Sequence, residues 1–241
     1  MTSSEVPAYL NTLLLEISNV EGVDIILIPP FTSLPKASEL LSEIQSVRLG
    51  AQNMSAQAKG AFTGEISASM LRDLFVRYVL VGHSERRHLF GETNKMVHDK
   101  IVAAHHNKIR PILCIGETQE ERVAGKEKQV LEQQLREALT GIAPEDIADT
   151  IIAYEPVWAI GTGCTATVTE AQEAHHFIRK IITTLSNSTI SAKVRLQYGG
   201  SVTPLNAREL LSAPDIDGAL VGSASLDARS FAEIVMAASR G

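Results

Sequence analysis

Short apolar stretches alternate along this chain with longer segments in which apolar residues recur with a helical period. The short stretches are rich in Val, Ile and Leu, as is typical of strands buried on both faces, and the longer segments are typical of amphipathic helices. The pattern predicts seven strands, at residues 23–28, 47–52, 78–81, 110–115, 150–154, 194–198 and 219–221. It predicts helices near residues 34–44, 67–74, 94–107 and 127–140, and three more capped by Thr169 (in a capping box with Gln172), by Thr203 and by Asp227.

Strands that alternate with helices predict parallel βαβ units, and a chain of 241 residues is long enough to form an α/β barrel as one domain. We therefore expect residues 1–241 to form a single domain of the α/β class. A (β/α)8 barrel closes with eight strands, whereas the pattern predicts only seven.

The first predicted element is a helix rather than a strand. Ser3 or Ser4 is a suitable N-cap, Pro7 suits the first turn, and one face carries Val6, Leu10, Leu13, Leu14 and Ile17. The simplest interpretation is that one barrel strand is missing before Met1, so that this chain holds seven of the eight strands.

Charge and cysteine content narrow the class of protein. The net charge of −6 argues against nucleic acid as a partner, although a local anion site can still be built from backbone N–H groups. Cys114 and Cys164 are too few for a disulfide framework and fit a reducing compartment. The sequence shows no signal peptide and no long apolar run, so we expect a cytoplasmic protein that does not cross a membrane.

The segment from Ala153 to Gly163 reads AYEPVWAIGTG and follows a buried strand. Glu155 stands where that strand emerges, and Pro156 prevents it from continuing in the sheet. The apolar residues and two glycines that follow suit a lid that can hinge over a ligand, and Trp158 is the only tryptophan in the chain. A surface glutamate before an ordinary loop is the alternative interpretation.

Other candidate groups also stand at the carboxyl ends of predicted strands: Gln52, His83, Tyr198–Ser201 and Gly222–Ser223. A parallel barrel brings these ends to one face, which is where barrel enzymes have their active sites. This shared placement predicts an enzyme.

Several motifs give the chain a resemblance to the triosephosphate isomerase family. Besides the segment around Glu155, they are GAQN (50–53), GAFTGE (60–65), GHSERR (82–87), CIGE (114–117), YGGSV (198–202) and LVG (220–222). The resemblance implies a TIM barrel that interconverts dihydroxyacetone phosphate and D-glyceraldehyde 3-phosphate. It implies a cytoplasmic homodimer, joined through the loop that contains Thr63, with neither a metal nor another cofactor.

The resemblance also assigns roles to individual residues. Glu155 would be the general base, because one carboxylate can take a proton from one carbon and return it to the next. His83 would be the electrophile and would stay neutral, since it lies just before a predicted helix N-terminus. Glu85 matches an active-site glutamate of the family, and an acid that complements a helix dipole is an equally good interpretation.

The phosphate group would be held by N–H groups near the last two strands. The residues that the resemblance assigns to this role are Gly161, Ser201, Gly222 and Ser223. The family usually has a second glycine where this chain has Ser223, and it usually opens the far lid hinge with lysine where this chain has Cys164.

The largest departure from the family is at the start of the chain. The first strand of the family ends in Asn-Trp-Lys-Met, and Met1 stands where that methionine would be. The asparagine and lysine of the family's active site are therefore absent. The alternative to an isomerase is thus a catalytically silent phosphate-binding or interaction protein.

Overall fold

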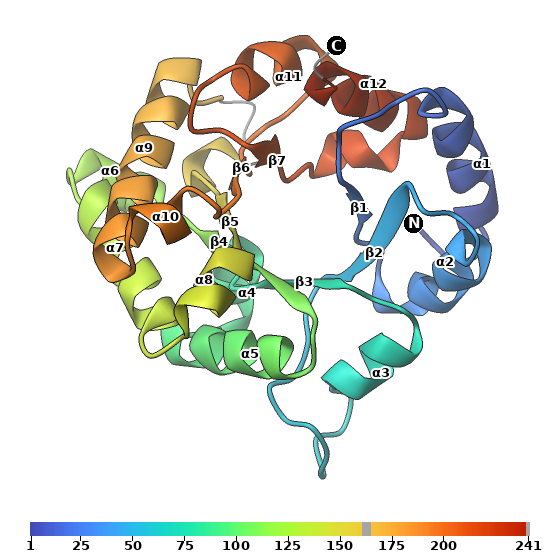
Figure 1. Ribbon diagram of the computed structural model, residues 1–241, viewed down its shortest axis with the longest axis horizontal. Helices are drawn as coiled ribbons and strands as arrows, with labels where there is room; N and C mark the ends of the chain where they lie inside the picture. The colour runs from blue at the N-terminus through green and yellow to red at the C-terminus, as the bar shows by residue number, and fades with distance from the viewer. Residues whose placement is uncertain (161–164, 240–241) are drawn as a thin grey trace.

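The computed structural model describes residues 1–160 and 165–239 and contains one parallel sheet of seven strands in sequence order. Figure 1 shows the strands around a central space, with the helices as an outer ring. The α/β barrel class and the count of seven strands are as predicted. The strands are β1 Ile25–Leu27, β2 Val47–Ala51, β3 Tyr78–Val81, β4 Arg110–Ile115, β5 Ile151–Tyr154, β6 Leu196–Tyr198 and β7 Gly218–Ala219.

The outer ring contains helices of very different length. The α-helices are α1 Val6–Glu16, α2 Leu34–Leu41, α3 Ala68–Asp73, α4 Ser84–Phe90, α5 Asn94–His106, α6 Gln119–Val123, α7 Glu127–Leu139, α8 Pro144–Asp149, α9 Val168–Leu185, α10 Ser188–Ser191, α11 Pro204–Leu211 and α12 Ala228–Ala238. The described residues also form short 3₁₀ turns, η1 Phe31–Ser33, η2 Val157–Ala159 and η3 Ser223–Leu226. None of the described helices is long and apolar enough to span a membrane.

Helix starts were predicted with mixed success. Thr203 and Asp227 cap α11 and α12 as predicted. The capping box at Thr169 is wrong, because Thr167 and Glu170 form the box and α9 starts two residues earlier. The N-cap of α1 is Glu5, with no side-chain cap, rather than Ser3 or Ser4. The short helices α4, α6, α8 and α10 were missed because so few turns cannot show a helical period.

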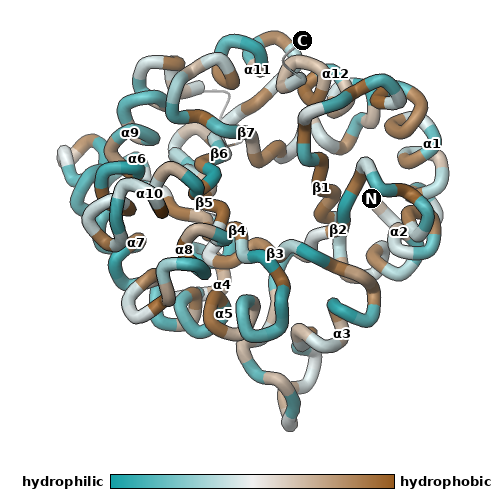
Figure 2. Tube along the Cα trace, in the orientation of Figure 1, coloured by the Kyte–Doolittle hydropathy of each residue, from teal (hydrophilic) through white to brown (hydrophobic). Residues whose placement is uncertain are grey.

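The apolar core has two layers. The larger layer lies between the sheet and the helices, and a smaller one fills part of the barrel interior with Tyr78, Leu80, Ile112, Cys114, Ile151 and Ala153. In Figure 2, β1 is brown, whereas the helices of the outer ring alternate between brown and teal. Strands with apolar residues on both faces and helices with one apolar face give this two-layer arrangement.

The sheet does not close between β1 and β7. Each of these strands pairs with one neighbour only, among the residues described, and Figure 1 shows a space between them. The outer ring does close there, because α1 packs against α12 and the hydroxyl of Tyr9 donates a 2.7 Å hydrogen bond to the carbonyl of Ser225. The predicted barrel with a gap is therefore what the structure contains.

A cavity of about 970 Å³ occupies the gap and the adjoining barrel interior. Apolar side chains of α1 and α12 form its outer wall, among them Val6, Leu10 and Ile234. It extends from Glu155 at the carboxyl end of the sheet to Asp217 at the amino end. The strand ends that carry the candidate residues therefore open into one continuous space.

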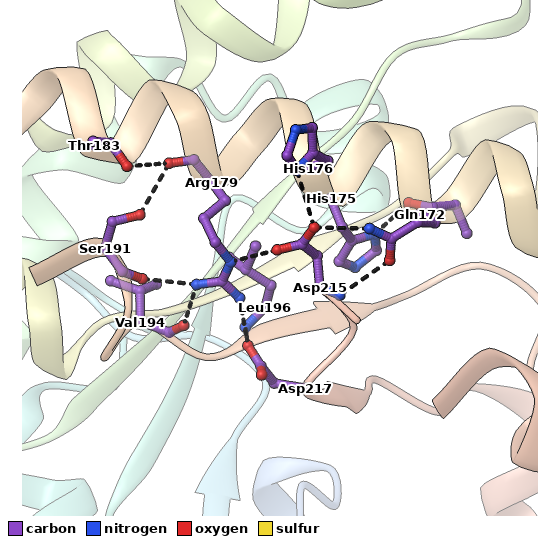
Figure 3. A network of polar contacts seen from close by, with 11 residues as sticks. Gln172, His175, His176, Arg179, Thr183, Ser191, Val194, Leu196, Asp215 and Asp217 are labelled. Carbon is purple, nitrogen blue, oxygen red and sulfur yellow. Dashed lines mark hydrogen bonds and ion pairs between the residues drawn. The ribbon is translucent and has the colours of Figure 1, made fainter. Parts of the chain in front are cut away.

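A polar network at the amino end of the sheet holds the last units of the barrel together (Figure 3). Arg179 on α9 donates to Asp215 Oδ1 and to Asp217 Oδ2, both at 2.8 Å, and to the carbonyl of Ser191 at 2.7 Å. Asp217 also accepts a 2.9 Å bond from the N–H of Leu196 in β6. The network thereby fixes the approach to β7.

Candidate active site

Glu155 and His83 meet at the carboxyl end of the sheet. Glu155 follows β5 and His83 follows β3, and His83 Nε2 lies 2.9 Å from Glu155 Oε1. The other carboxylate oxygen, Oε2, accepts a 3.0 Å bond from the backbone N–H of Ser84, the first residue of α4. The side chain of Glu155 is only 2% exposed, so the carboxylate is a buried group held by two donors.

His83 is oriented from both ring nitrogens. Its Nδ1 accepts a 3.3 Å bond from the N–H of Glu85, so the proton of the ring lies on Nε2 and points at Glu155. Burial acts to lower the pKa of His83, but the hydrogen bond and charge of Glu155 outweigh it, and the pKa is raised. The Nδ1 atom that accepts from the N–H of Glu85 carries no proton, and the neutral state assigned to His83 stays a prediction.

Two glycines allow the backbone and side chain of Glu155 to lie where they do. A Cβ on Gly116 would overlap the carbonyl oxygen of Glu155, and a Cβ on Gly199 would lie 2.9 Å from Glu155 Cγ. The N–H of Glu155 donates to the carbonyl of Ile115 at 2.7 Å, which continues the pairing of β4 with β5. The base is therefore positioned by the ends of two neighbouring strands.

Glu85 lies beside His83 but away from Glu155. Its side chain is 69% exposed, and its Oε2 is 3.9 Å from His83 Nδ1. Its position in the first turn of α4 fits an acid that complements the helix dipole, and it also lines the cavity. Glu85 therefore has the placement that each of its two interpretations requires.

The residues assigned to the phosphate site lie along the same cavity where they are described. Ser201, Gly222 and Ser223 all line it, and Ser223 begins η3. Gly161 lies outside the described residues, as does Cys164 at the far hinge. Gln52 also lines the cavity, where its side-chain amide donates to the carbonyl of Ile28 at 3.2 Å.

The start of the predicted lid is anchored to Glu117, which is fully buried. Glu117 Oε1 accepts bonds from Trp158 Nε1 at 2.9 Å and from the hydroxyl of Tyr154 at 3.0 Å. The guanidinium of Arg122 lies 4.5 Å from the centre of the Trp158 ring. The tryptophan in this loop is therefore a specific contact, as its unusual place in the sequence suggested.

The loop containing Thr63 protrudes from the body of the domain between β2 and α3 (Figure 1). Its base is closed by a 2.8 Å bond from the N–H of Ser55 to the carbonyl of Ile66, and Phe62 in the loop is 48% exposed. Thr63 is exposed and is not among the residues that line the cavity of its own chain.

Comparison with known proteins agrees with this arrangement. The sequence model of triosephosphate isomerase matches residues 1–238. The triosephosphate isomerase of Carboxydothermus hydrogenoformans is 50% identical over 97% of this chain and 93% of the relative. That of Aquifex aeolicus is 52% identical over 97% and 94%, and that of Dictyoglomus thermophilum is 48% identical over the same shares.

The chain belongs to the triosephosphate isomerase family. Membership confirms the resemblance, the fold class and the reaction class predicted from the sequence. The roles of Glu155, His83, Glu85, Gly161, Ser201, Gly222 and Ser223 stay predictions, although the structure brings Glu155 and His83 into contact.

The sequence did not identify two residues that position the candidate site of this member of the triosephosphate isomerase family. The N–H of Ser84 bonds Glu155, and Glu117 orients the start of the lid. Glu117 lies in the CIGE motif and Ser84 directly follows His83, so the position of each residue in the sequence indicated that it lies near the site. Nothing in the sequence indicated which atoms they would contact.

Proposed function

We propose that this chain interconverts dihydroxyacetone phosphate and D-glyceraldehyde 3-phosphate, a reaction of glycolysis and gluconeogenesis. The observation that carries the proposal is the buried Glu155 carboxylate, 2.9 Å from His83 Nε2 in a cavity at the carboxyl ends of the strands. The names and identities of the relatives supply the substrate.

Glu155 acts as the base in this proposal. Its carboxylate removes a proton from the carbon next to the substrate carbonyl and returns a proton to the former carbonyl carbon. Between these steps the substrate is an enediolate. The hydroxyl proton moves in the same sense as the carbon-bound proton, so that the former carbonyl oxygen becomes a hydroxyl and the former hydroxyl oxygen becomes the carbonyl. Burial at 2% exposure limits competition from water for the base.

His83 acts as the electrophile. With Nδ1 accepting from the N–H of Glu85, Nε2 carries a proton that it can donate to the substrate oxygens. In the arrangement described, that proton is directed at Glu155. Substrate must therefore separate the two side chains and insert its reacting carbons and oxygens between them.

The phosphate of the substrate is bound by backbone N–H groups of Ser201, Gly222 and Ser223, together with Gly161. Support comes from the position of Ser223 at the start of η3, next to Gly222, where N–H groups have no partner within a helix. Such a local site would bind an anion despite the net charge of −6 of the protein as a whole.

The proposed assembly is a cytoplasmic homodimer in which the loop around Thr63 reaches a second copy. The protrusion of this loop and the 48% exposure of Phe62 within it support that role, since exposed aromatic side chains are enriched in protein–protein contacts.

A catalytically silent phosphate-binding protein is the second candidate. It is favoured by one observation: the residues described as lining the cavity include no lysine. A fixed ammonium near the developing enediolate would stabilise it, so its absence lowers turnover without preventing phosphate binding.

Deuterium exchange distinguishes the two functions. Dihydroxyacetone phosphate is incubated with the protein in heavy water, and NMR follows both the aldehyde product and deuterium at carbon. The isomerase proposal expects both, with loss of both in Glu155→Gln. Binding of the substrate without exchange in the unmodified chain would establish the silent protein instead.

A further inference from the structure

The guanidinium of Arg87, on α4, joins the carboxyl ends of two strands from behind the site. Its Nε donates a 2.7 Å bond to the carbonyl of Gly82, and its Nη2 donates a 3.2 Å bond to the carbonyl of Cys114. Its Nη1 donates at 2.6 Å to the side-chain carbonyl of Asn94. Three separate acceptors thus fix the plane of one side chain.

The contact with Gly82 is so close that it restricts the residue there. Gly82 has φ +70°, and a Cβ would lie 2.7 Å from Arg87 Nη2 and 2.9 Å from Val97 Cγ2. The turn after β3 is therefore pressed against the guanidinium, and the next residue in the chain is His83.

The contact with Cys114 leads to the other half of the site. Cys114 pairs with Ala153 across β4 and β5, two residues before Glu155. The thiol of Cys114 is fully buried beside Glu155, and burial raises its pKa. One guanidinium therefore links the strand end that presents His83 with the strand that supports Glu155.

The charge of Arg87 is compensated only from a distance. No carboxylate of the described residues lies within ion-pair distance of it. Asn94, which accepts from Arg87, donates a 2.9 Å bond from its Nδ2 to Glu137 Oε2, so Glu137 is linked to Arg87 through Asn94. Burial lowers the pKa of Arg87, and nearby carboxylates, Glu92 and Glu155 among them, act in the opposite direction. A half-buried cation without an ion pair is costly to retain for packing alone.

We propose that Arg87 is a positioning residue, which sets the separation of His83 and Glu155 by holding the ends of β3 and β4 together. The role rests on the proposed isomerisation for its effect on turnover. Its effect on the resting contact between the two side chains is independent of activity.

The test compares Arg87→Lys and Arg87→Met with the matched control Arg110→Met. Arg110 stands at the opposite end of β4, where its Nε donates a 2.7 Å bond to the carbonyl of Asp149. The control thus removes an arginine that bonds a neighbouring carbonyl from the same strand, β4, but at the amino end of that strand and away from Glu155 and His83. Thermal melting of all three variants is measured first.

Kinetics give the first readout. Because displacement of a catalytic group by about 1 Å costs roughly 100-fold, we expect Arg87→Met to lower kcat by about that factor, with KM changed less than about threefold. Arg87→Lys keeps the charge but reaches fewer carbonyls. Its kcat should therefore lie between that of Arg87→Met and that of the unmodified chain. Arg110→Met lowers the melting temperature and leaves kcat within about twofold of the unmodified chain.

NMR of the His83 imidazole gives the second readout, which needs no turnover. The Nε2 proton bonded to Glu155 shifts and exchanges faster with water in Arg87→Lys and Arg87→Met, and not in Arg110→Met. If Arg87→Met does not fold, Arg87→Lys decides both measurements.

An unshifted Nε2 resonance in the folded Arg87 variants overturns the positioning role. So does an equal loss of kcat in the control. If the unmodified chain is inactive, the isomerase proposal fails, while the NMR comparison still decides the role of Arg87.

Discussion

Gly199 lies directly against the side chain of Glu155: a Cβ at position 199 would be 2.9 Å from Glu155 Cγ and 3.2 Å from the carbonyl oxygen of Tyr154. Neither atom is the free end of a flexible side chain. The side chain of Glu155 can therefore keep its rotamer only because residue 199, in the YGGS turn, has no Cβ.

Gly199→Ala should accordingly lower turnover more than stability. The methyl group displaces Glu155 from its contact with His83, and we expect kcat to fall roughly 10- to 100-fold. The matched control is Gly218→Ala, whose Cβ would meet nothing closer than Gln197 Cγ at 3.5 Å. Steady-state kinetics of both variants check this, and equal kcat values for the two would refute the steric role of Gly199.

Glu155→Asp should lose several orders of magnitude in kcat while keeping its affinity for a phosphate-bearing inhibitor. The shorter side chain withdraws the carboxylate by about 1 Å from a position set by His83 and the N–H of Ser84. Calorimetric titration with the inhibitor serves as the control for folding and phosphate binding. Turnover equal to that of the unmodified chain would remove Glu155 from the mechanism.

The positions of both these residues were predictable because they depend on strand ends. The predicted carboxyl ends of β5 and β6, at Tyr154 and Tyr198, are those observed, since each of these strands pairs with a neighbour on both sides. The last strand was predicted at 219–221, but β7 covers only Gly218–Ala219. It pairs with β6 alone, so neighbours on one side determine its length.

The contacts within the site were not predictable in the same way. Arg87 and Glu117 each bond a residue distant in sequence, Cys114 and Tyr154 respectively, and the direction of their side chains is set by packing. A sequence period tells which face of a helix or strand is buried, but not which carbonyl a guanidinium will reach.

The network around Asp215 predicts a pH-dependent stability. Although burial alone would raise the pKa of Asp215, hydrogen bonds from Gln172, Arg179 and His176 lower it. Its contribution is therefore present above the unfolded-state pKa of an aspartate, and it is lost as the pH falls through the lowered pKa of the folded state.

Asp215→Asn should thus reduce the free energy of unfolding at pH 7 by roughly 1–3 kcal/mol, and the difference from the unmodified chain should shrink below about pH 4. Urea unfolding at a series of pH values measures it. Asp99→Asn is the control. Among the described residues Asp99 bonds Lys95 alone, on an exposed helix face, and its replacement should change stability by less than about 1 kcal/mol at any pH. A difference that stays constant with pH would show that packing rather than charge accounts for the loss.

The last prediction concerns the gap between β1 and β7. A version of the chain carrying an additional N-terminal strand that ends in Asn-Trp-Lys should be more stable and more active than the 241-residue chain. The two strand edges would then be paired, which removes sites for aggregation or swapped pairing.

The physical reasons for the gain are separate and can be measured separately. The cavity of about 970 Å³, with apolar walls from α1 and α12, provides the volume for a strand, so its filling should raise the melting temperature. The lysine would add a positive charge near the enediolate and the phosphate, and single electrostatic donors of this kind are worth roughly 3–4 kcal/mol in the transition state. A third version, with the same strand ending in Asn-Trp-Met, keeps the packing and removes the charge. It should melt like the version with lysine but turn over substrate several hundred-fold more slowly, in line with that electrostatic term. If the 241-residue chain melts at the same temperature and turns over substrate as fast as the version with lysine, then neither the open edges nor the added lysine matters.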